Sequence, residues 1–403
     1  PLHARAFGPW ILAGDEPVPN EHSLLPHSDL VFVDPPGTGF SRIAHDEGRA
    51  RLLSTVADTD AFEAFVRGWL ERYDRTGAPL HFVGESFGGY RLARLAERLC
   101  DLRVGSIVFI SPILDLTASE ETVGNDLPFV FALPTMAAAA WFHGKASSHA
   151  TDLESVWNAA EGFARSELLP ALHLGSALDD VERDRLVAKV IALTGLRTET
   201  IAAARLRVGT EEFLSTLRGS EGLLIGRLDV RITGPQPEPA TGDRPASADD
   251  PALGVGRRNV IHSAPLARYL HAQVGVPGDE SYVSLSLDVN FSWNWAPAST
   301  GPAFTASAVP SVAALLAACP DVRVLLIGGR FDLATPLAAA IHALRHGDIP
   351  PKNVEVLALD GGHSLDSATL PRAHEAVIRL IQNKSPHDDG RLLRTAEKEG
   401  DDG

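Results

Sequence analysis

The chain has 403 residues and a formal net charge of −16 at neutral pH. This length allows either two domains or one domain that carries a large insertion. The negative charge disfavours binding to nucleic acids and to anionic lipid surfaces, so these function classes are set aside. Two cysteines, Cys100 and Cys319, are too few for a disulfide framework and lack the spacing of zinc ligands, although one bridge or two thiols both remain possible.

No segment indicates a membrane span, an export signal, a metal site or a cofactor. The apolar runs are all shorter than the roughly 18 residues that a membrane helix requires. No His, Asp or Glu grouping has the spacing of a metal site. The sequence opens at Pro1 without a basic stretch followed by an apolar one, which is the pattern of a signal peptide. We expect the sequence to be a fragment that begins inside a larger core.

The first region predicts buried parallel strands at residues 29–33, 80–83 and 104–110, because each is a short apolar run that ends in turn residues. Between the first two strands we expect a helix that stops near Gly77 and Pro79. Its predicted buried face consists of aromatic residues three and four positions apart: Phe62, Phe65, Trp69 and Tyr73.

The middle region, residues 116–318, predicts amphipathic helices such as 178–194 and almost nothing else, so we expect a helical lid over the sheet. Within it, the stretch 234–256 is rich in Pro, Gly, Ala and Asp and predicts a mobile surface loop.

The last region repeats the strand signal at residues 322–327 and 354–359 around a helix that is expected to start with Thr335 as its N-terminal cap and Pro336 in its first turn. That helix is expected to end before Gly347. A final helix after Pro371 is expected to bury a set of apolar side chains: Ala373, Val377, Leu380 and Ile381. The charged tail, residues 384–403, is expected to be disordered.

This alternation of strands and helices predicts an α/β fold with a mostly parallel central sheet. Residues 1–115 and 319–383 would form the two parts of one core, with its N-terminal strands missing, and residues 116–318 the lid inserted between them.

Residues 84–89 read Gly-Glu-Ser-Phe-Gly-Gly and stand between a predicted strand and a predicted helix. In such a strand-to-helix turn a serine is exposed as a nucleophile, and Gly84 and Gly88 are expected to supply the space that the tight turn needs. The turn directs the backbone N–H of Phe87 toward the place where an oxyanion develops. We therefore identify Ser86 as the candidate nucleophile and Phe87 as an oxyanion donor.

A serine hydroxyl needs a base, and the base needs a carboxylate to orient it. Asp332 follows one predicted strand of the last region, and His363 follows the next, so both leave the carboxyl edge of the sheet. The order Ser, Asp, His is the order of the α/β-hydrolase fold. Asp360 is the rival acid, ranked lower because it precedes the histidine by only three residues. On their own, Asp332 and His363 would be interpreted as a helix cap and a surface histidine.

Four segments together give the chain a resemblance to the serine carboxypeptidase family, most similar to its bacterial branch. Residues 84–90 resemble the nucleophile motif of the family, and residues 33–41 (Val-Asp-Pro-Pro-Gly-Thr-Gly-Phe-Ser) resemble one of its loops. Residues 329–332 (Gly-Arg-Phe-Asp) and 362–363 (Gly-His) resemble its acid and base motifs.

The resemblance implies an α/β-hydrolase that releases a C-terminal amino acid from a peptide through an acyl-enzyme on Ser86. It implies a peptide substrate with a free C-terminus, with Glu85 and Tyr90 as substrate-binding residues, and it implies a secreted or periplasmic location. Glu85 can help to bind a carboxylate only when it is protonated, because two anions repel, so we expect an acidic activity optimum. A structural role for Glu85 as a hydrogen-bonded support of the turn is the alternative.

Two departures from the family pattern concern the start of the chain. The family's Asn-Gly-Gly-Pro-Gly segment, which precedes the region matching Phe7-Gly8-Pro9 and gives a second oxyanion donor, is absent. Where some members have a glutamate that bonds the counterpart of Glu85, this chain has Ala6. An acyltransferase or esterase with the same three residues, and a non-catalytic binding protein, are therefore kept as alternatives. Trp293 and Trp295 are expected to be core or lid contacts.

Overall fold

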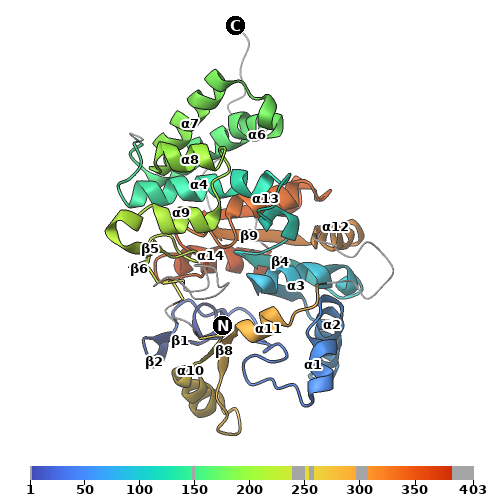
Figure 1. Ribbon diagram of the computed structural model, residues 1–403. Helices are drawn as coiled ribbons and strands as arrows, with labels where there is room; N and C mark the ends of the chain where they lie inside the picture. The colour runs from blue at the N-terminus through green and yellow to red at the C-terminus, as the bar shows by residue number, and fades with distance from the viewer. Residues whose placement is uncertain (1, 148–149, 238–249, 254–257, 296–306, 384–403) are drawn as a thin grey trace.

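The computed structural model describes residues 2–147, 150–237, 250–253, 258–295 and 307–383. At its centre lies a four-stranded sheet in the order β10–β9–β4–β3, and every neighbouring pair in it is parallel (Figure 1). The strands are β3 (Leu80–Glu85), β4 (Val104–Ile110), β9 (Arg323–Gly329) and β10 (Val354–Leu359). The predicted parallel sheet is confirmed.

Both faces of the central strands β4 and β9 are buried, which explains why these strands are almost continuously apolar. Ile107 and Phe109 point to one face of β4, toward the helices α3 (Phe87–Leu95), α12 (Val309–Ala318) and α13 (Leu337–Arg345). Val108 and Ile110 point to the other face, toward α14 (Leu370–Ile381). The alternation follows the two-residue period of a strand.

The register of the sheet aligns the strand ends that matter for a site. Glu85, at the end of β3, pairs with Ile110 of β4, which pairs with Ile327 of β9. Gly329, at the end of β9, pairs with Leu359 at the end of β10. The loops that follow β3, β9 and β10 therefore leave the same edge of the sheet.

The predicted strand at residues 29–33 is wrong, because no strand is formed there. Leu30 packs on the core beside α14, but Val31 and Phe32 are each 42% exposed. The apolar run is thus divided between core and surface instead of entering the sheet.

The helix predicted before β3 is α2 (Thr55–Arg72), preceded by α1 (Asp46–Leu52). Of its predicted aromatic face, Phe62 is partly buried against the core, but the prediction is wrong for Phe65 and Tyr73. Phe65 is 38% exposed and Tyr73, beyond the last helical residue, is 53% exposed. The buried side chains of α2 are Thr55, Asp58, Thr59 and Leu70. The reason is an ion pair: Asp58 accepts two hydrogen bonds from Arg91 of α3, at 2.7 and 3.0 Å, which turns the polar side of α2 inward.

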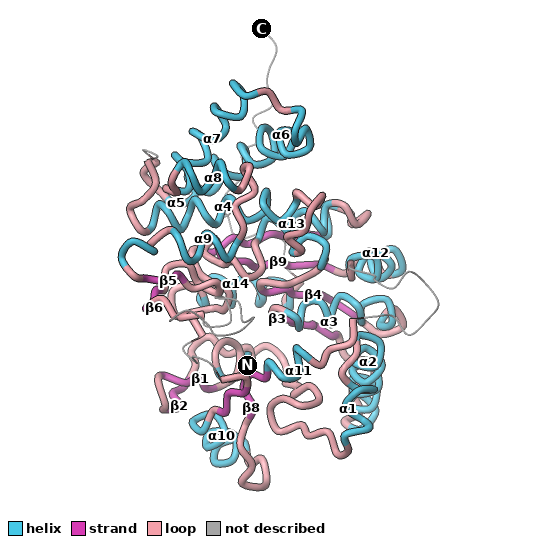
Figure 2. Tube along the Cα trace, in the orientation of Figure 1, coloured by secondary structure: helices cyan, strands magenta, loops and turns pink. Residues whose placement is uncertain are grey.

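A group of helices lies together at one end of the molecule, above the sheet in the view of Figures 1 and 2. It comprises α4 (Leu127–Phe142), α5 (Leu153–Phe163), α6 (Leu169–Leu174), α7 (Asp180–Thr194), α8 (Thr198–Ala203) and α9 (Thr210–Thr216). Helix α7 corresponds to the predicted helix 178–194. Asp179 caps it by accepting the N–H of Glu182, and Gly195 ends it in the left-handed conformation.

The expectation that residues 116–318 are almost entirely helical is wrong for two short antiparallel pairs. β5 (Leu223–Ile225) pairs with β6 (Thr233–Pro235), and β7 (Val260–His262) pairs with β8 (Val283–Ser286). α11 (Leu287–Phe291) follows β8. The division of the chain into core and lid stays a prediction.

The unit formed by β7, β8 and α10 (Ala264–Tyr269) packs against the N-terminal hairpin of β1 (Trp10–Ala13) and β2 (Glu16–Pro19). This packing joins two segments that are distant in the sequence, and Figure 2 shows them side by side.

The predicted loop 234–256 begins inside β6, and Asp250 within it is buried. Its residues 238–249 and 254–256 lie outside the described residues, as does the tail 384–403.

Two details of the last region and the cysteines complete the fold. The final helix buries Ala373, Val377 and Leu380 as predicted, whereas Ile381 is half-buried. Cys100 and Cys319 are free thiols, and the Sγ of Cys319 lies 3.4 Å from the Cys100 carbonyl oxygen. Within the described residues, none of the helices has both the length and the apolar sequence needed to span a lipid bilayer.

Candidate active site

Ser86 occupies a strained turn between β3 and α3. Its φ of 56° and ψ of −122° lie in a region that residues with a side chain rarely adopt. The turn is held by main-chain hydrogen bonds on both sides: the Ser86 N–H donates to Ile110 O at 2.9 Å, and the Gly89 N–H donates to Ser86 O at 2.9 Å. Such strain persists only where the surrounding structure enforces it, and it is common at catalytic residues.

Two glycines make this turn possible, and one of them was not expected. A Cβ on Gly84 would lie 2.4 Å from the Gly88 carbonyl oxygen, so the predicted need for glycine at position 84 is met. A Cβ on Gly89 would lie 2.6 Å from the Cβ of Pro112. A Cβ on Gly88 would meet no atom within 4 Å, so the spatial role expected of Gly88 belongs to Gly89 instead.

Phe87 follows Ser86 as the first residue of α3, so its backbone N–H has no acceptor within the helix. Its ring centroid lies 5.0 Å from that of Trp293, 5.6 Å from that of Trp295 and 5.7 Å from that of Tyr90. The two tryptophans are thus packing partners of the residue beside Ser86. Tyr90 is only 2% exposed and belongs to the core, so its expected contact with substrate stays a prediction.

Asp332 and His363 form a buried pair beyond the ends of β9 and β10. The Nδ1 of His363 lies 2.9 Å from the Oδ2 of Asp332, and the two residues are 9% and 0% exposed. The other carboxylate oxygen, Oδ1, accepts the N–H groups of Ala334 and Thr335 at 2.9 and 3.1 Å. These bonds fix the carboxylate plane, and a hydrogen bond at Nδ1 leaves Nε2 of the imidazole available to accept a proton.

Thr335 supports the same pair, although its sequence pattern indicated a helix cap. Helix α13 is capped by Pro336 without a side-chain bond. The hydroxyl of Thr335 lies 2.7 Å from Asp332 Oδ2, 2.9 Å from the carbonyl oxygen of Ser111 and 3.2 Å from His363 Nδ1. This hydroxyl therefore joins the acid to the end of β4.

Asp360, the rival acid, points elsewhere. Its side chain is 60% exposed and its Oδ1 lies 2.5 Å from the Nη1 of Arg330. The geometry thus favours Asp332 as the partner of His363.

The loops that carry His363 and Ser86 meet through their neighbours. The hydroxyl of Ser364 donates to the Oε1 of Glu85 at 2.8 Å, so the residue after the histidine contacts the residue before the serine. Sequence reasoning missed Ser364, whose only signal is its position beside His363. In the described part of the chain no hydrogen bond joins Ser86 Oγ directly to His363.

The surroundings of His363 act on its pKa in opposite directions. Burial lowers the pKa, and so does the charge of Arg227, but the charge and hydrogen bond of Asp332, together with the charge of Glu85, outweigh them. The pKa of His363 is therefore raised above its ordinary value of 6.5. Since a base must be neutral to accept a proton, this shift works against the acidic optimum expected from Glu85.

Residues 226–231, here called the bracing segment, contact both loops of the pair and were not identified from the sequence. The Leu333 N–H donates to Arg227 O at 3.0 Å, and the His363 N–H donates to Leu228 O at 2.7 Å. In return the Val230 N–H donates to Phe331 O at 3.0 Å. The bracing segment thus holds the Asp332 and His363 loops in one arrangement.

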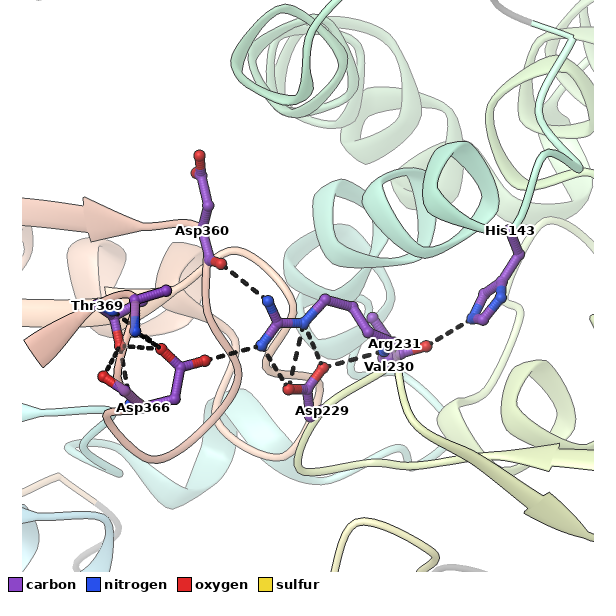
Figure 3. Close-up of polar contacts among 8 residues, drawn as sticks. His143, Asp229, Val230, Arg231, Asp360, Asp366 and Thr369 are labelled. Atoms are coloured by element: carbon purple, nitrogen blue, oxygen red, sulfur yellow. Dashed lines mark hydrogen bonds and ion pairs between the residues drawn. The ribbon is translucent and has the colours of Figure 1, made fainter. Parts of the chain in front are cut away.

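Side chains of the bracing segment add an ionic network around the histidine loop (Figure 3). Arg231 pairs with Asp229 at 2.7 Å and with Asp366 at 3.2 Å, and its Nη1 donates to Asp360 O at 3.1 Å. Burial raises the pKa of Asp366, but its bonds from Thr369 and from Arg231 lower it further than burial raises it. The carboxylate of Asp366 therefore stays charged and, through Arg231, ties the loop around His363 to the bracing segment.

Among the described residues no group of three His, Cys, Asp or Glu side chains is placed to hold an ion.

Comparison with known proteins finds similarity to serine carboxypeptidases over part of the sequence and in the fold. Residues 4–106 match the family model described as serine carboxypeptidase. This stretch includes Glu85, Ser86 and Phe87, while Asp332 and His363 lie outside it. A sequence comparison with curated proteins finds no match.

Among solved structures, Kex1(delta)p, a prohormone-processing carboxypeptidase from Saccharomyces cerevisiae, aligns with a TM-score of 0.54 and 13% identity, over 95% of this chain and 80% of that one. VinJ aligns with a TM-score of 0.32 and 15% identity, over 81% of this chain and 73% of that one. The first match shows that the chain has the fold of a serine carboxypeptidase, an α/β-hydrolase, as predicted.

Proposed function

We propose that this protein is a serine-type carboxypeptidase that hydrolyses the C-terminal peptide bond of its substrate through an acyl-enzyme on Ser86. The observation that carries the proposal is the buried Asp332–His363 pair at the sheet edge where the strained Ser86 also lies. The serine carboxypeptidase match of residues 4–106 and the shared fold support a peptidase. Assignment to the bacterial branch rests on the sequence motifs alone.

In the proposed reaction the Ser86 oxygen attacks the carbonyl carbon of the last peptide bond while its proton moves to Nε2 of His363. The C–N bond then breaks, and the imidazolium gives that proton to the leaving amine of the C-terminal amino acid. Water, deprotonated by the same nitrogen, attacks the carbonyl carbon of the acyl-enzyme. The bond between that carbon and the Ser86 oxygen breaks, the imidazolium returns the proton to this oxygen, and the shortened peptide leaves. Asp332 holds Nδ1 throughout and stabilises the imidazolium.

The negative charge on the carbonyl oxygen needs hydrogen-bond donors. The backbone N–H of Phe87 has no acceptor in α3, and it stands at the positive end of that helix, so we assign it as one oxyanion donor. A second donor is not assigned.

Glu85 directly precedes the proposed nucleophile Ser86 and belongs to the proposed active site. Its bond from Ser364 supports the structural alternative, in which Glu85 ties the histidine loop to the serine turn. We propose that Glu85 has two roles. Its first role is to connect the histidine loop to the serine turn, and its second is to contact the substrate. For Tyr90, its stacking on Phe87 supports a positioning role, in which it fixes the residue that carries the oxyanion donor.

A pair of matched substrates tests the proposal. The protein is incubated with an N-blocked dipeptide that has a free carboxylate and with the same dipeptide amidated at its C-terminus, and Ser86→Ala serves as the control. We expect hydrolysis of the free acid in preference to the amide, and labelling by a fluorophosphonate that Ser86→Ala abolishes.

Other outcomes separate the alternatives. Cleavage of an ester without a free carboxylate, with neither dipeptide cleaved, would assign the site to an esterase or acyltransferase. Equal cleavage of the amidated dipeptide would show that the enzyme does not require a free C-terminus. A serine that resists fluorophosphonate would favour a binding protein and contradict the proposal.

A further inference from the structure

The two cysteines of the chain lie beside each other, although they are 219 positions apart in the sequence. The Sγ of Cys319 lies 3.4 Å from the carbonyl oxygen of Cys100. Cys100 is exposed and Cys319 is half-buried, so a reagent in solution can reach the pair. The sequence contains two cysteines in all, and the fold brings both to one place on the surface.

Each cysteine stands at the end of a helix. Cys319 ends α12, where its N–H donates to Leu315 O at 2.7 Å and its carbonyl oxygen accepts the Val322 N–H at 3.1 Å. Cys100 directly follows η2 (Ala96–Leu99), a 3-10 helix that continues α3. Helix α12 packs against both α3 and η2 (Figure 1). The two thiols are therefore attached to neighbouring helix ends.

The main chain on both sides of Cys100 is anchored to α2. Arg67 of α2 donates to the carbonyl oxygen of Arg98 at 2.8 Å, and it holds the carboxylate of Asp101 with hydrogen bonds of 2.8 and 2.9 Å. Leu99 is fully buried in the core cluster that also contains side chains of α12. Packing thus keeps the two cysteines at a constant separation.

This separation is compatible with a disulfide. A carbonyl oxygen lies about 2.4 Å from the Cα of its own residue, so the Sγ of Cys319 is at most about 6 Å from the Cα of Cys100. A cysteine side chain and an S–S bond of about 2.05 Å together span about 5 Å from the Cα. Because these lengths are comparable, rotation of the exposed Cys100 side chain with a small shift of its loop brings the sulfurs together.

We infer that Cys100 and Cys319 form a redox-sensitive pair, which a low-molecular-weight disulfide such as oxidised glutathione converts into an intramolecular disulfide that locks α3 and η2 to α12. The exposed Cys100, as its thiolate, attacks one sulfur of oxidised glutathione, so that a mixed disulfide forms and one glutathione leaves. The thiolate of Cys319 then attacks the Cys100 sulfur and displaces the second glutathione. The two protein thiols lose two electrons and two protons, and the glutathione disulfide gains them.

The bond acts on the stability of the fold. It closes a loop that contains the whole chain between the two cysteines, and such a closure restricts the unfolded state. It also connects α3, which begins beside Ser86, to α12, which leads into β9 and Asp332. The pair lies about 20 Å along α3 and η2 from Ser86, so the bond does not touch the reactive atoms.

The test treats the wild-type protein with oxidised glutathione or with dithiothreitol and then counts its thiols with a maleimide under denaturing conditions. Cys100→Ser and Cys319→Ser are the matched variants, since each keeps one thiol and cannot close the bond. Mass spectrometry of the intact protein and of its proteolytic peptides identifies the product, and thermal unfolding gives the Tm of each form.

We expect two free thiols in the reduced wild type and none in the oxidised one, which should be lighter by two hydrogen atoms and yield a peptide that joins Cys100 to Cys319. Its Tm should exceed that of the reduced protein by about 2–6 °C. In both serine variants the Tm should not respond to the treatment. None of these measurements depends on enzymatic activity, so the result is independent of the proposed function.

Three results would overturn the inference. The first is an oxidised wild type that keeps both thiols, carries a glutathione on each of them, or forms its disulfide between two molecules. The second is an intramolecular disulfide that leaves the Tm unchanged or lowers it, because the bond would then not lock the helices. The third is an equal rise in Tm in a serine variant. Should the serine variants not fold, the cross-linked peptide and the Tm of the wild type decide.

Discussion

Replacing Asp332 by asparagine tests the catalytic arrangement most directly. Oδ1 of Asp332 accepts two backbone N–H groups, so in the variant the amide oxygen must occupy this position. The amide NH₂ then takes the place of Oδ2 and faces Nδ1 of His363, which lies 2.9 Å from Oδ2 in the native protein. His363 must accept at Nδ1, and its proton moves to Nε2. The nitrogen that should act as base is thereby blocked.

The expected loss follows from the tautomer. A wrong tautomer in a Ser-His-Asp arrangement costs about 10⁴-fold in kcat, which corresponds to about 5.5 kcal/mol in the activation free energy. The free energy of unfolding should fall by much less than this, because the shape of the side chain and most of its hydrogen bonds are kept. Loss of the Asp332 charge should also lower the pKa of His363.

The assay measures kcat for the free-acid dipeptide, the rate of fluorophosphonate labelling and the Tm of each variant. Asp360→Asn is the matched control, because Asp360 is the rival acid and contacts Arg330 instead of His363. An Asp332→Asn enzyme within about 10-fold of the wild type, or a larger loss in Asp360→Asn, would refute the assignment of Asp332.

Three further predictions concern the turn, the pH profile and the fold. A methyl group on Gly84 would lie 2.4 Å from a main-chain oxygen, so Gly84→Ala should destabilise the protein by about 1–3 kcal/mol and abolish fluorophosphonate labelling; normal labelling would contradict this. The negative charge of Glu85 raises the pKa of His363, so Glu85→Gln should lower that pKa and move the acid limb of the kcat/KM profile to lower pH. A limb that stays in place or moves to higher pH would be evidence against this coupling. Asp58→Ala leaves the charge of Arg91 buried without its partner and should lower the free energy of unfolding by about 3–5 kcal/mol in urea titrations, whereas a loss below about 1 kcal/mol would show that the pair is not needed.

The sheet and the order of its loops could be predicted because they follow from local rules. A strand buried on both faces, such as β4, is apolar throughout, and both β4 and the edge strand β10 were predicted with the bounds that the structure has. Since parallel strands align their carboxyl ends, the loops of Asp332 and His363 were expected at one edge without any coordinates.

The misassigned elements depend on partners that a single sequence does not specify. The apolar run 29–33 has the composition of a strand but forms no ladder. The inward face of α2 is decided by Arg91, which lies on another helix. Thr335 has the sequence pattern of a helix cap, whereas its hydroxyl bonds Asp332 and the carbonyl oxygen of Ser111.

The bracing segment was missed for the same reason, because its partners are even more distant in the sequence. Its contacts to Leu333 and His363 join residues more than one hundred positions apart, and they use main-chain atoms, which have no side-chain signature. No periodicity or motif could have found it.

These main-chain contacts also limit how such an enzyme is re-engineered. Residues 226–231 belong to the chain between β5 and β6, so an exchange of the helical region for that of another protein would remove the support of the acid and base loops along with it. A chimera that keeps this short stretch with the recipient sheet should retain catalytic competence, whereas a graft that replaces it would carry all three reactive side chains and still fail to align them.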